Sequence, residues 1–214
     1  DKKYLKAGVY LFPPELSVSQ IIDAIFNAKY LYIAKITFPE GIDYKAFASL
    51  LQSKALIDST KFVELAVSDS LLKSRDIPAN SIEGYLLPET YEFFIESSAK
   101  DAIDKLLNYH SKMYDRISAV SSNNAKLNKH EILTLASIVE AETPDDDERE
   151  RVAGLYLNRI NKNMLLQADP TVAYILNGKK RLLYEDLKID NPYNTYKYKG
   201  LPPAPINNPG AKSI

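Results

Sequence analysis

Two glutamates end the most apolar segment of this 214-residue chain, and they are the side chains best placed for acid–base chemistry. Glu140 and Glu142 follow a run, residues 132–139, that is apolar around most of a helix circumference. A helix this apolar is buried, and its carboxyl end carries the negative pole of the helix dipole. Burial and the dipole both raise the pKa of a glutamate, as a general acid working near neutral pH requires.

The spacing of the two glutamates does not decide between them. Positions two apart on a helix differ by about 200° in direction, so both side chains cannot point into one small site. A non-catalytic interpretation also stands, in which either glutamate solvates the helix end or pairs with Arg149 or Arg151. Geometry alone leaves these alternatives open.

Asp169, in the loop at residues 167–171, is the second carboxylate to consider. An aspartate before a proline also predicts a helix cap, with Pro170 in the first helical position, and this interpretation is favoured. Asn158 and Arg159, on the helix before this loop, can face a ligand. The stretch at residues 191–196 supplies amides and aromatic rings of the kind found in sugar sites, with Asn194 and Tyr196 among them.

Composition excludes several other kinds of chemistry. The absence of cysteine excludes disulfides, thiolate metal sites and cysteine nucleophiles. His110 and His130 lie far apart and lack HExxH spacing, so no metal or other cofactor is expected. The formal net charge of −1, spread along the chain, argues against nucleic acid as a partner. The apolar share of 45% and charged share of 26% are those of a globular protein.

The two ends of the chain resemble cuts through a longer protein. The chain begins abruptly at Asp1 and stops at Ile214. No stretch approaches the roughly 20 apolar residues of a membrane span, and no signal peptide is present. We therefore expect that any membrane anchor lies outside this sequence.

The elements that must position these side chains follow an α+β pattern. Strand patterns at residues 7–12 and 30–38 alternate with helix patterns at 17–28 and 42–51, which predicts a compact module. Two short helical stretches follow between residues 54 and 75. Residues 83–91 are expected to form a loop with a short extended piece.

The second part of the chain is predicted to be mainly helical. A long helix over residues 99–120 ends at the polar run 121–124, and helices over 129–142 and 145–161 follow, separated by Pro144. The last of these has an apolar stripe for packing, formed by Val152, Leu155, Tyr156 and Ile160. The final third is expected to form loops and short strands over the helical pair.

Several motifs, in order along nearly the whole chain, resemble one family. They are AGVY at 7–10, PEG at 39–41, EGYLLPETY at 83–91, ASIVEAET at 136–143, RVA at 151–153, LNR at 157–159, LQADPTV at 166–172, YNTY at 193–196, GLPP at 200–203 and PGA at 209–211. This set resembles the endolytic murein transglycosylase family, also called the YceG-like family. Agreement of so many ordered motifs makes the resemblance specific.

The resemblance implies an α+β fold with two domains. A small LysM-like α/β module would occupy residues 1–75, and a mainly helical catalytic domain with short strands would occupy residues 76–214. It further implies a longer protein, with one N-terminal span in the inner membrane, the enzyme on the periplasmic face, and a catalytic domain continuing past Ile214. Peptidoglycan glycan strands are the implied substrate, and cell-wall synthases are candidate partners.

The resemblance also implies a mechanism that needs one acid. Aligned with the family, the second glutamate of the pair, Glu142, is the catalytic residue, with Glu140 as the fallback. It would protonate the bond between N-acetylmuramic acid (MurNAc) and N-acetylglucosamine (GlcNAc), then take the proton of the sugar's own C6 hydroxyl. The product is a 1,6-anhydro-MurNAc end, and the cut would terminate or release nascent strands. Residues implied to orient the sugar or stabilise its charge are Gln167, Asp169, Asn194 and Tyr196.

Two other functions remain open from the sequence. A muramidase that hydrolyses with water needs a second carboxylate, for which Asp169 is the candidate. A scaffold that binds peptidoglycan without catalysis is consistent with a LysM-like N-terminal part. The form of the released sugar end distinguishes the first, and binding without product release distinguishes the second.

Overall fold

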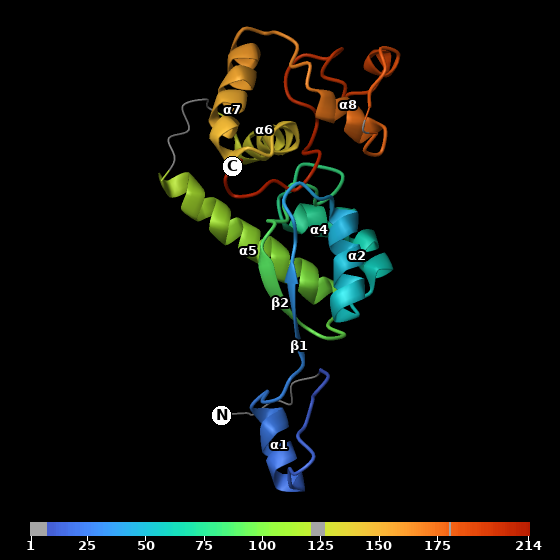
Figure 1. The fold of residues 1–214 in the computed structure, drawn as a ribbon, viewed down its shortest axis with the longest axis vertical. Helices are drawn as coiled ribbons and strands as arrows, with labels where there is room; N and C mark the ends of the chain where they lie inside the picture. Colours follow the sequence, from blue (N-terminus) through green and yellow to red (C-terminus); the bar gives the residue numbers. More distant parts are fainter. Residues whose placement is uncertain (1–7, 121–126, 180) are drawn as a thin grey trace.

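The computed structural model describes residues 8–120, 127–179 and 181–214, and in it the molecule is elongated, with three tiers (Figure 1). Helix α1 (Val18–Phe26) forms one end. The middle tier holds strands β1 (Ile33–Thr37) and β2 (Thr90–Phe94) with helices α2 (Tyr44–Ala55), α3 (Ser59–Ala66), α4 (Asp69–Ser74) and α5 (Ala99–Val120). The far end holds α6 (Lys129–Glu142), α7 (Asp146–Asn161), α8 (Asp169–Ile175) and the short 3-10 helix η1 (Asp186–Lys188).

The N-terminal tier is small. Helix α1 begins where the pattern over residues 17–28 predicts, with a capping box between Ser17 and Gln20. The strand predicted at residues 7–12 is reduced to a single bridge between Tyr10 and Leu31, and its first residue lies outside the described part of the chain. The second predicted strand is confirmed as β1, over a shorter range than 30–38.

The sheet of the middle tier joins segments far apart in the sequence. β1 and β2 are antiparallel, with Ile36 opposite Tyr91. β2 contains the end of the segment predicted as a loop with an extended piece, and the sequence alone did not show that it would pair with β1. The boundary predicted at residue 75 passes through one continuous core, because buried residues from Ile36 to Leu133 form a single cluster. The fold is therefore mixed helical with a small two-stranded sheet, a coarse α+β arrangement.

The helices around this sheet follow from their caps and apolar faces. The Asp43 carboxylate accepts a hydrogen bond from the Ala46 backbone N–H at 2.7 Å and so begins α2. α3 and α4 are the two predicted short helices, and α5 has the predicted range. Ile103 and Leu106 of α5 are buried in the core, and the polar run at 121–124 lies outside the described residues.

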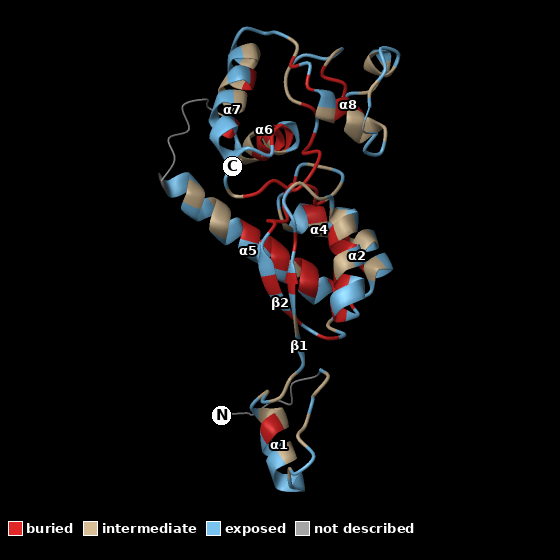
Figure 2. Ribbon diagram, viewed as in Figure 1, coloured by how far each residue is buried: buried red, intermediate tan, exposed pale blue. Residues whose placement is uncertain are grey.

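α6 crosses the interior of the third tier and is its most buried element (Figure 2). A capping box between Asn128 and Glu131 begins it, and residues 133–139 are all buried. α7 begins after Pro144, in agreement with the helix predicted over residues 145–161, and Asp145 is its cap. Its predicted stripe is partly wrong, since Leu155 is exposed whereas Tyr156 is buried.

The final third departs from its prediction. Its described residues form α8, η1 and loops, without the short strands that the sequence suggested. Residues 201–210 run back across the molecule and are largely buried. Within the described ranges, no helix is both long and apolar enough to cross a membrane.

Candidate active site

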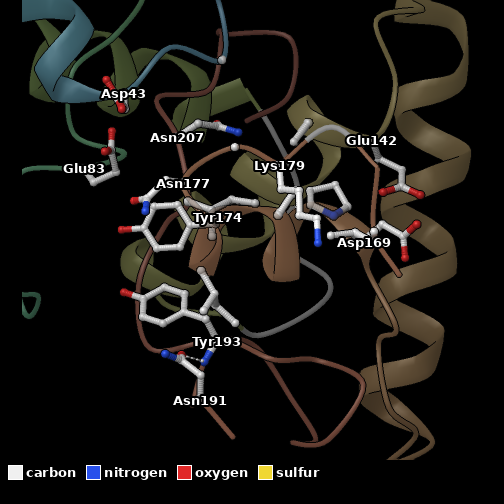
Figure 3. A pocket seen from close by; sticks show the side chains of 18 of the residues that line it. Asp43, Glu83, Glu142, Asp169, Tyr174, Asn177, Lys179, Asn191, Tyr193 and Asn207 are labelled. Atoms are coloured by element: carbon white, nitrogen blue, oxygen red, sulfur yellow. Dashed lines mark hydrogen bonds between the residues drawn. The ribbon is translucent and has the colours of Figure 1, made fainter. Parts of the chain in front are cut away.

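A hollow with a volume of about 1090 Å³ lies between the middle and third tiers (Figure 3). Its wall combines carboxyl groups, tyrosine rings and amides from six parts of the chain. The polar and aromatic lining residues include Asp43, Tyr44, Lys45, Glu83, Glu142, Asp169, Tyr174, Asn177, Lys179, Asn191, Tyr193 and Asn207. We call this hollow the cleft. Its volume exceeds the usual range of about 300–1,000 Å³ for small-molecule pockets, so it can hold more than one sugar ring.

Glu142 is the last residue of α6, and it lines the cleft. The residue as a whole is exposed, yet protein around its carboxyl group removes part of the solvent, and this desolvation raises the pKa of Glu142. The negative charge of Asp169 raises that pKa further, and a hydrogen bond from the Tyr156 phenol partly opposes the rise. A carboxyl group in this state keeps its proton to a higher pH than an ordinary glutamate.

Side chains from α7, α8 and the 191–196 loop surround Glu142. Tyr156 is buried, which raises the pKa of its phenol, and the nearby positive charge of Arg159 opposes this rise. Tyr196 donates a hydrogen bond to the Asp169 carboxylate. Burial and this bond raise the pKa of Tyr196 to about 12, so its phenol stays protonated at neutral pH. The structure therefore brings together four predicted residues, Glu142, Arg159, Asp169 and Tyr196.

The interpretation of Asp169 as a helix cap is wrong. α8 begins at Asp169 itself, its cap is Ala168, and no side chain makes a capping hydrogen bond there. Pro170 accordingly occupies the second helical position. The Asp169 carboxylate instead accepts a hydrogen bond from Tyr196 and lines the cleft, where it faces Glu142 (Figure 3).

Glu140 lies in a different environment, on the other side of α6. Its side chain is only 5% exposed, and its Oε2 atom accepts hydrogen bonds from Arg149 Nη1 at 2.7 Å, the Gly210 N–H at 2.9 Å and Ser213 Oγ at 2.9 Å. For this glutamate, the predicted pairing with Arg149 is confirmed. Glu140 does not line the cleft.

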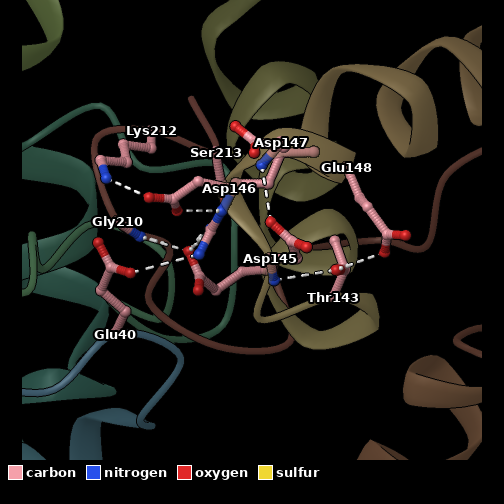
Figure 4. Close-up of polar contacts among 11 residues, drawn as sticks. Glu40, Thr143, Asp145, Asp146, Asp147, Glu148, Gly210, Lys212 and Ser213 are labelled. Atoms are coloured by element: carbon pink, nitrogen blue, oxygen red, sulfur yellow. Dashed lines mark hydrogen bonds and ion pairs between the residues drawn. The ribbon is translucent and has the colours of Figure 1, made fainter.

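Arg149 joins three segments around Glu140. Figure 4 shows Glu40, Asp146, Gly210 and Ser213, which come together around this contact. It also contacts Glu40 at 3.4 Å and Asp146 at 3.1 Å, and it donates to Ser213. Residues Glu40, Glu140, Asp146, Arg149, Gly210 and Ser213 are named the Arg149 cluster. A Cβ atom on Gly210 would lie 2.0 Å from Glu40 Oε1, so a larger residue at this position would require the Glu40 side chain to move.

Three further predicted residues lie outside the cleft lining. Asn194 is fully buried, and its amide donates to the carbonyls of Leu187 and Ile189 while its oxygen accepts from the Tyr196 N–H. Gln167 is exposed, with a left-handed backbone at φ 51°. Asn158 is exposed on α7 and lies two positions, or about 200°, from Tyr156.

Sequence reasoning missed two residues of the cleft region. Tyr156 was assigned to packing, and nothing in the local pattern indicates that its phenol reaches Glu142. Glu83 lies in a recognised motif, but its burial to 2% exposure depends on contacts from distant segments. It accepts hydrogen bonds from the Tyr44 N–H at 3.2 Å and from Asn208 Nδ2 at 2.6 Å. Burial and the charge of Asp43 raise the pKa of Glu83 to about 8.

The described residues contain no group of three or more His, Cys, Asp or Glu side chains arranged to hold a metal ion. The polar groups of the cleft are instead carboxyl groups, phenols, amides and two lysines. This set can exchange protons with a substrate and can form hydrogen bonds to hydroxyl and amide groups.

Comparisons with known proteins agree on one family. The model of the YceG-like family matches residues 1–214. A Bacillus subtilis (strain 168) protein named endolytic murein transglycosylase is 33% identical over 228 residues, covering 97% of this chain and 62% of the relative. A protein of the same name from Streptococcus pneumoniae serotype 2 (strain D39 / NCTC 7466) is 29% identical over 242 residues, covering 98% of this chain and 44% of the relative.

A solved structure gives the same result for the fold. The crystal structure of a YceG-like protein from Listeria monocytogenes superposes with a TM-score of 0.73 at 31% identity. The match covers 98% of this chain and 74% of that one. The chain thus spans less than two thirds of the length of the two named transglycosylases that it matches.

Proposed function

This chain belongs to the YceG-like family, and from that premise we propose that it carries the catalytic cleft of an endolytic peptidoglycan lytic transglycosylase. The reaction would cleave the MurNAc–GlcNAc bond and leave 1,6-anhydro-MurNAc ends, so terminating or releasing nascent glycan strands. The observation that supports this most strongly is the environment of Glu142, a carboxyl group of raised pKa in the wall of a cleft large enough for a glycan.

The proposed reaction uses Glu142 twice. Its protonated carboxyl group donates to the glycosidic oxygen as the bond from that oxygen to MurNAc C1 breaks, and the GlcNAc side leaves as an alcohol. The C6 hydroxyl of the same MurNAc then attacks C1, and its proton passes to the Glu142 carboxylate. Because the nucleophile belongs to the substrate, proximity replaces a second catalytic acid or a bound water.

The neighbours of Glu142 have supporting parts in this proposal. The Asp169 carboxylate helps to keep Glu142 protonated and can stabilise positive charge that develops at C1. Tyr196 donates a hydrogen bond to the Asp169 carboxylate, and Arg159 lies near the phenols of Tyr156 and Tyr196. Asn194 is a positioning residue, because its buried amide fixes the loop that carries Tyr196. Gln167 is available to a sugar that extends beyond the cleft.

The setting of the reaction is part of the same proposal. An enzyme acting on peptidoglycan works outside the cytoplasm, on the periplasmic face of the inner membrane, and the anchor of the full-length protein would hold it there. The LysM-like resemblance assigns glycan binding to the N-terminal part. Cell-wall synthases that make the strands are the proposed partners.

The test is mass spectrometry of purified glycan strands incubated with the full-length protein and with its Glu142→Gln and Glu140→Gln variants. We expect anhydro-muramic ends from the wild type and from folded Glu140→Gln, but none from Glu142→Gln. Unchanged release by Glu142→Gln would refute the assignment of the acid. No release by any of the three would favour the scaffold function.

Hydrolysis by water is the second candidate, and one observation favours keeping it. Asp169 lines the same cleft as Glu142 and raises its pKa, so two carboxyl groups do share the site. A hydrolase would use Asp169 as nucleophile or base. It would leave a reducing muramic acid end, which is heavier by one water than the anhydro end, so the same spectra decide between the two reactions.

A further inference from the structure

A segment near the end of the sequence contacts both walls of the cleft. Residues 206–210, which we call the strap, are all buried and run between the middle and third tiers (Figure 2). One wall of the cleft includes Asp43, Tyr44 and Glu83 of the middle tier, and another part includes Glu142 at the end of α6. The strap has no part in the proposed reaction, but its hydrogen bonds join these two walls.

On one side, the strap is bonded to α6. Ser137 of this helix is fully buried, and its Oγ atom accepts a hydrogen bond from the Ile206 N–H at 3.0 Å. The Ser137 carbonyl accepts another from Asn207 Nδ2 at 2.8 Å, and the Ser137 hydroxyl donates to the Thr134 carbonyl at 2.7 Å. Because Ser137 and Glu142 lie on one continuous helix, these bonds fix the strap relative to the backbone of Glu142.

On the other side, Asn208 is bonded to two loops of the middle tier. It is fully buried, and its Oδ1 atom accepts hydrogen bonds from the N–H groups of Gly84 at 2.8 Å and Leu86 at 3.1 Å. Its Nδ2 atom donates to the Ile42 carbonyl at 3.0 Å. Its backbone N–H donates to the same carbonyl at 3.1 Å, and its own carbonyl accepts from the Gly41 N–H at 3.0 Å.

Asn208 also reaches the lining of the cleft. Its Nδ2 atom donates to Glu83 Oε1 at 2.6 Å, and that oxygen also accepts the Tyr44 N–H at 3.2 Å. Tyr44 is the first residue of α2, so Glu83 links the strap to the start of this helix. Glu83 and Tyr44 both line the cleft. A continuous series of hydrogen bonds therefore runs from α6 through the strap to the wall formed by the middle tier.

Other contacts between the two tiers do not reach the lining of the cleft. Arg149 pairs with Glu40 at 3.4 Å, and the Tyr85 hydroxyl lies 2.9 Å from His130 Nδ1. None of these four residues lines the cleft. The strap, by contrast, connects lining residues of one wall to the helix that carries the proposed acid.

We propose that Asn208 is a positioning residue, which acts through Glu83 and the strap to set the distance between the Glu142 carboxyl group and the opposite wall of the cleft. This rests on the proposed function, because a glycan must contact that wall while Glu142 reaches its glycosidic oxygen. A displacement of about 1 Å can cost about 10²-fold in rate. A buried polar network in which every group is bonded is rigid, and Asn208 meets this condition with both atoms of its amide.

The separation of the tiers can be measured without substrate. The chain contains no cysteine, so spin labels can be placed at Lys54→Cys on α2 and Arg151→Cys on α7, where both side chains are exposed. Pulsed electron paramagnetic resonance then gives the distribution of distances between the labels. We expect one narrow distribution, which Asn208→Ala broadens or shifts. Asn194→Ala is the matched control and should leave it unchanged, because Asn194 is equally buried but its side-chain hydrogen bonds lie within residues 187–196 of the third tier.

Turnover of glycan strands tests the effect on the reaction. At saturating substrate, Asn208→Ala in the full-length protein should release anhydro ends about 10–10²-fold more slowly than wild type, with a smaller change in KM. Rates are expressed per folded molecule, with the folded fraction taken from thermal melts. A residue that only stabilised the fold would lower the folded fraction and leave this rate unchanged.

A reciprocal pair of substitutions covers the case in which Asn208→Ala does not fold. Asn208→Asp replaces the Nδ2 donor with an oxygen beside Glu83 Oε1, so two carboxyl groups meet, and the distribution should broaden. Adding Glu83→Gln supplies an amide N–H that can donate to the new oxygen. The double variant should therefore narrow the distribution again and recover part of the turnover.

Three results would overturn the inference. They are a wild-type distance distribution in the folded Asn208 variants, an equal broadening in Asn194→Ala, and unchanged turnover per folded molecule in a variant whose distribution has broadened. Failure of the proposed function has a different signature, namely a wild-type protein that releases no anhydro ends. The distance distributions would then still decide whether Asn208 fixes the two walls of the cleft.

Discussion

The two sides of the α6 carboxyl end hold the same type of side chain in opposite states. On one side the Glu140 side chain is 5% exposed and accepts three hydrogen bonds within the Arg149 cluster. On the other side Glu142 lines the cleft, where desolvation and Asp169 raise its pKa. The difference shows that the function of a carboxyl group follows from what faces it. A carboxylate that accepts several hydrogen bonds from the protein stabilises the fold. A carboxyl group with a raised pKa that lines a cleft can exchange a proton with a substrate.

The largest expected effect comes from removing the cleft acid. Glu142→Gln should lower turnover by about 10²–10⁴-fold, because a positioned general acid contributes that much. Its melting temperature should change little, since the residue is exposed as a whole. Initial rates on purified glycan strands and thermal melts measure the two quantities. Full loss of turnover in a stable Glu140→Gln protein, with activity kept by Glu142→Gln, would reverse the comparison.

Breaking the Arg149 cluster should lower the stability of the protein and leave the activity of the folded molecules largely unchanged. Arg149→Met leaves the buried Glu140 carboxylate without its ion pair, which typically costs about 3–5 kcal/mol of unfolding free energy. We expect a lower denaturation midpoint, measured by urea titration. The surviving folded fraction should keep its activity per molecule. A wild-type midpoint would show that the cluster contributes no net stability.

Glu83 provides a test through pH. Its pKa is raised from 4.5 to about 8 in the folded protein, so the folded state binds more protons than the unfolded state between these values. Stability should therefore fall as pH rises from about 4.5 to 8, by a few kcal/mol at most. Glu83→Gln keeps a similar shape and should flatten this dependence. Urea titrations of both proteins at pH 5 and pH 8 measure this dependence. An equal change in unfolding free energy between the two pH values for wild type and Glu83→Gln would contradict the prediction.

A smaller effect is expected at Asp169. Its charge helps to raise the pKa of Glu142, so Asp169→Asn should lower that pKa. Activity that needs protonated Glu142 is lost as pH rises through this pKa, and the alkaline limb of the rate profile should move to lower pH in the variant. Rates between pH 5 and 9 measure the shift. A limb that stays in place would mean that Asp169 does not influence the acid.

The smallest effect is expected at Asn158. The side chain is exposed and lies outside the cleft lining, so Asn158→Ala should change stability by less than about 0.5 kcal/mol and leave turnover on purified strands unchanged. Loss of turnover without loss of stability would show that the substrate extends over this face of α7. Arg159→Ala, at the next position of α7, is the matched variant for which we do expect a loss of turnover.

Local pattern was sufficient for much of the fold. The apolar run before Glu140 and the break at Pro144 predicted α6 and the start of α7, because helix periodicity and proline breaks depend on residues within a few positions. The pairing of β1 with β2 was not predictable in the same way, because it joins segments more than 50 residues apart. The strands expected in the final third were wrong for a related reason. That segment is held by side-chain and backbone contacts to α6 and to the 41–44 and 83–86 loops, without a ladder of its own.

By itself the sequence determined the family resemblance, the absence of thiol chemistry and the two glutamates among which the acid was to be sought. Only the tertiary structure separated those glutamates, because Arg149, Gly210 and Ser213 reach one of them from distant positions and leave the other to the cleft. It likewise placed Tyr156 on Glu142 and buried Glu83. The pKa of a carboxyl group depends on the charges and solvent within a few ångströms, and those neighbours are brought together by folding.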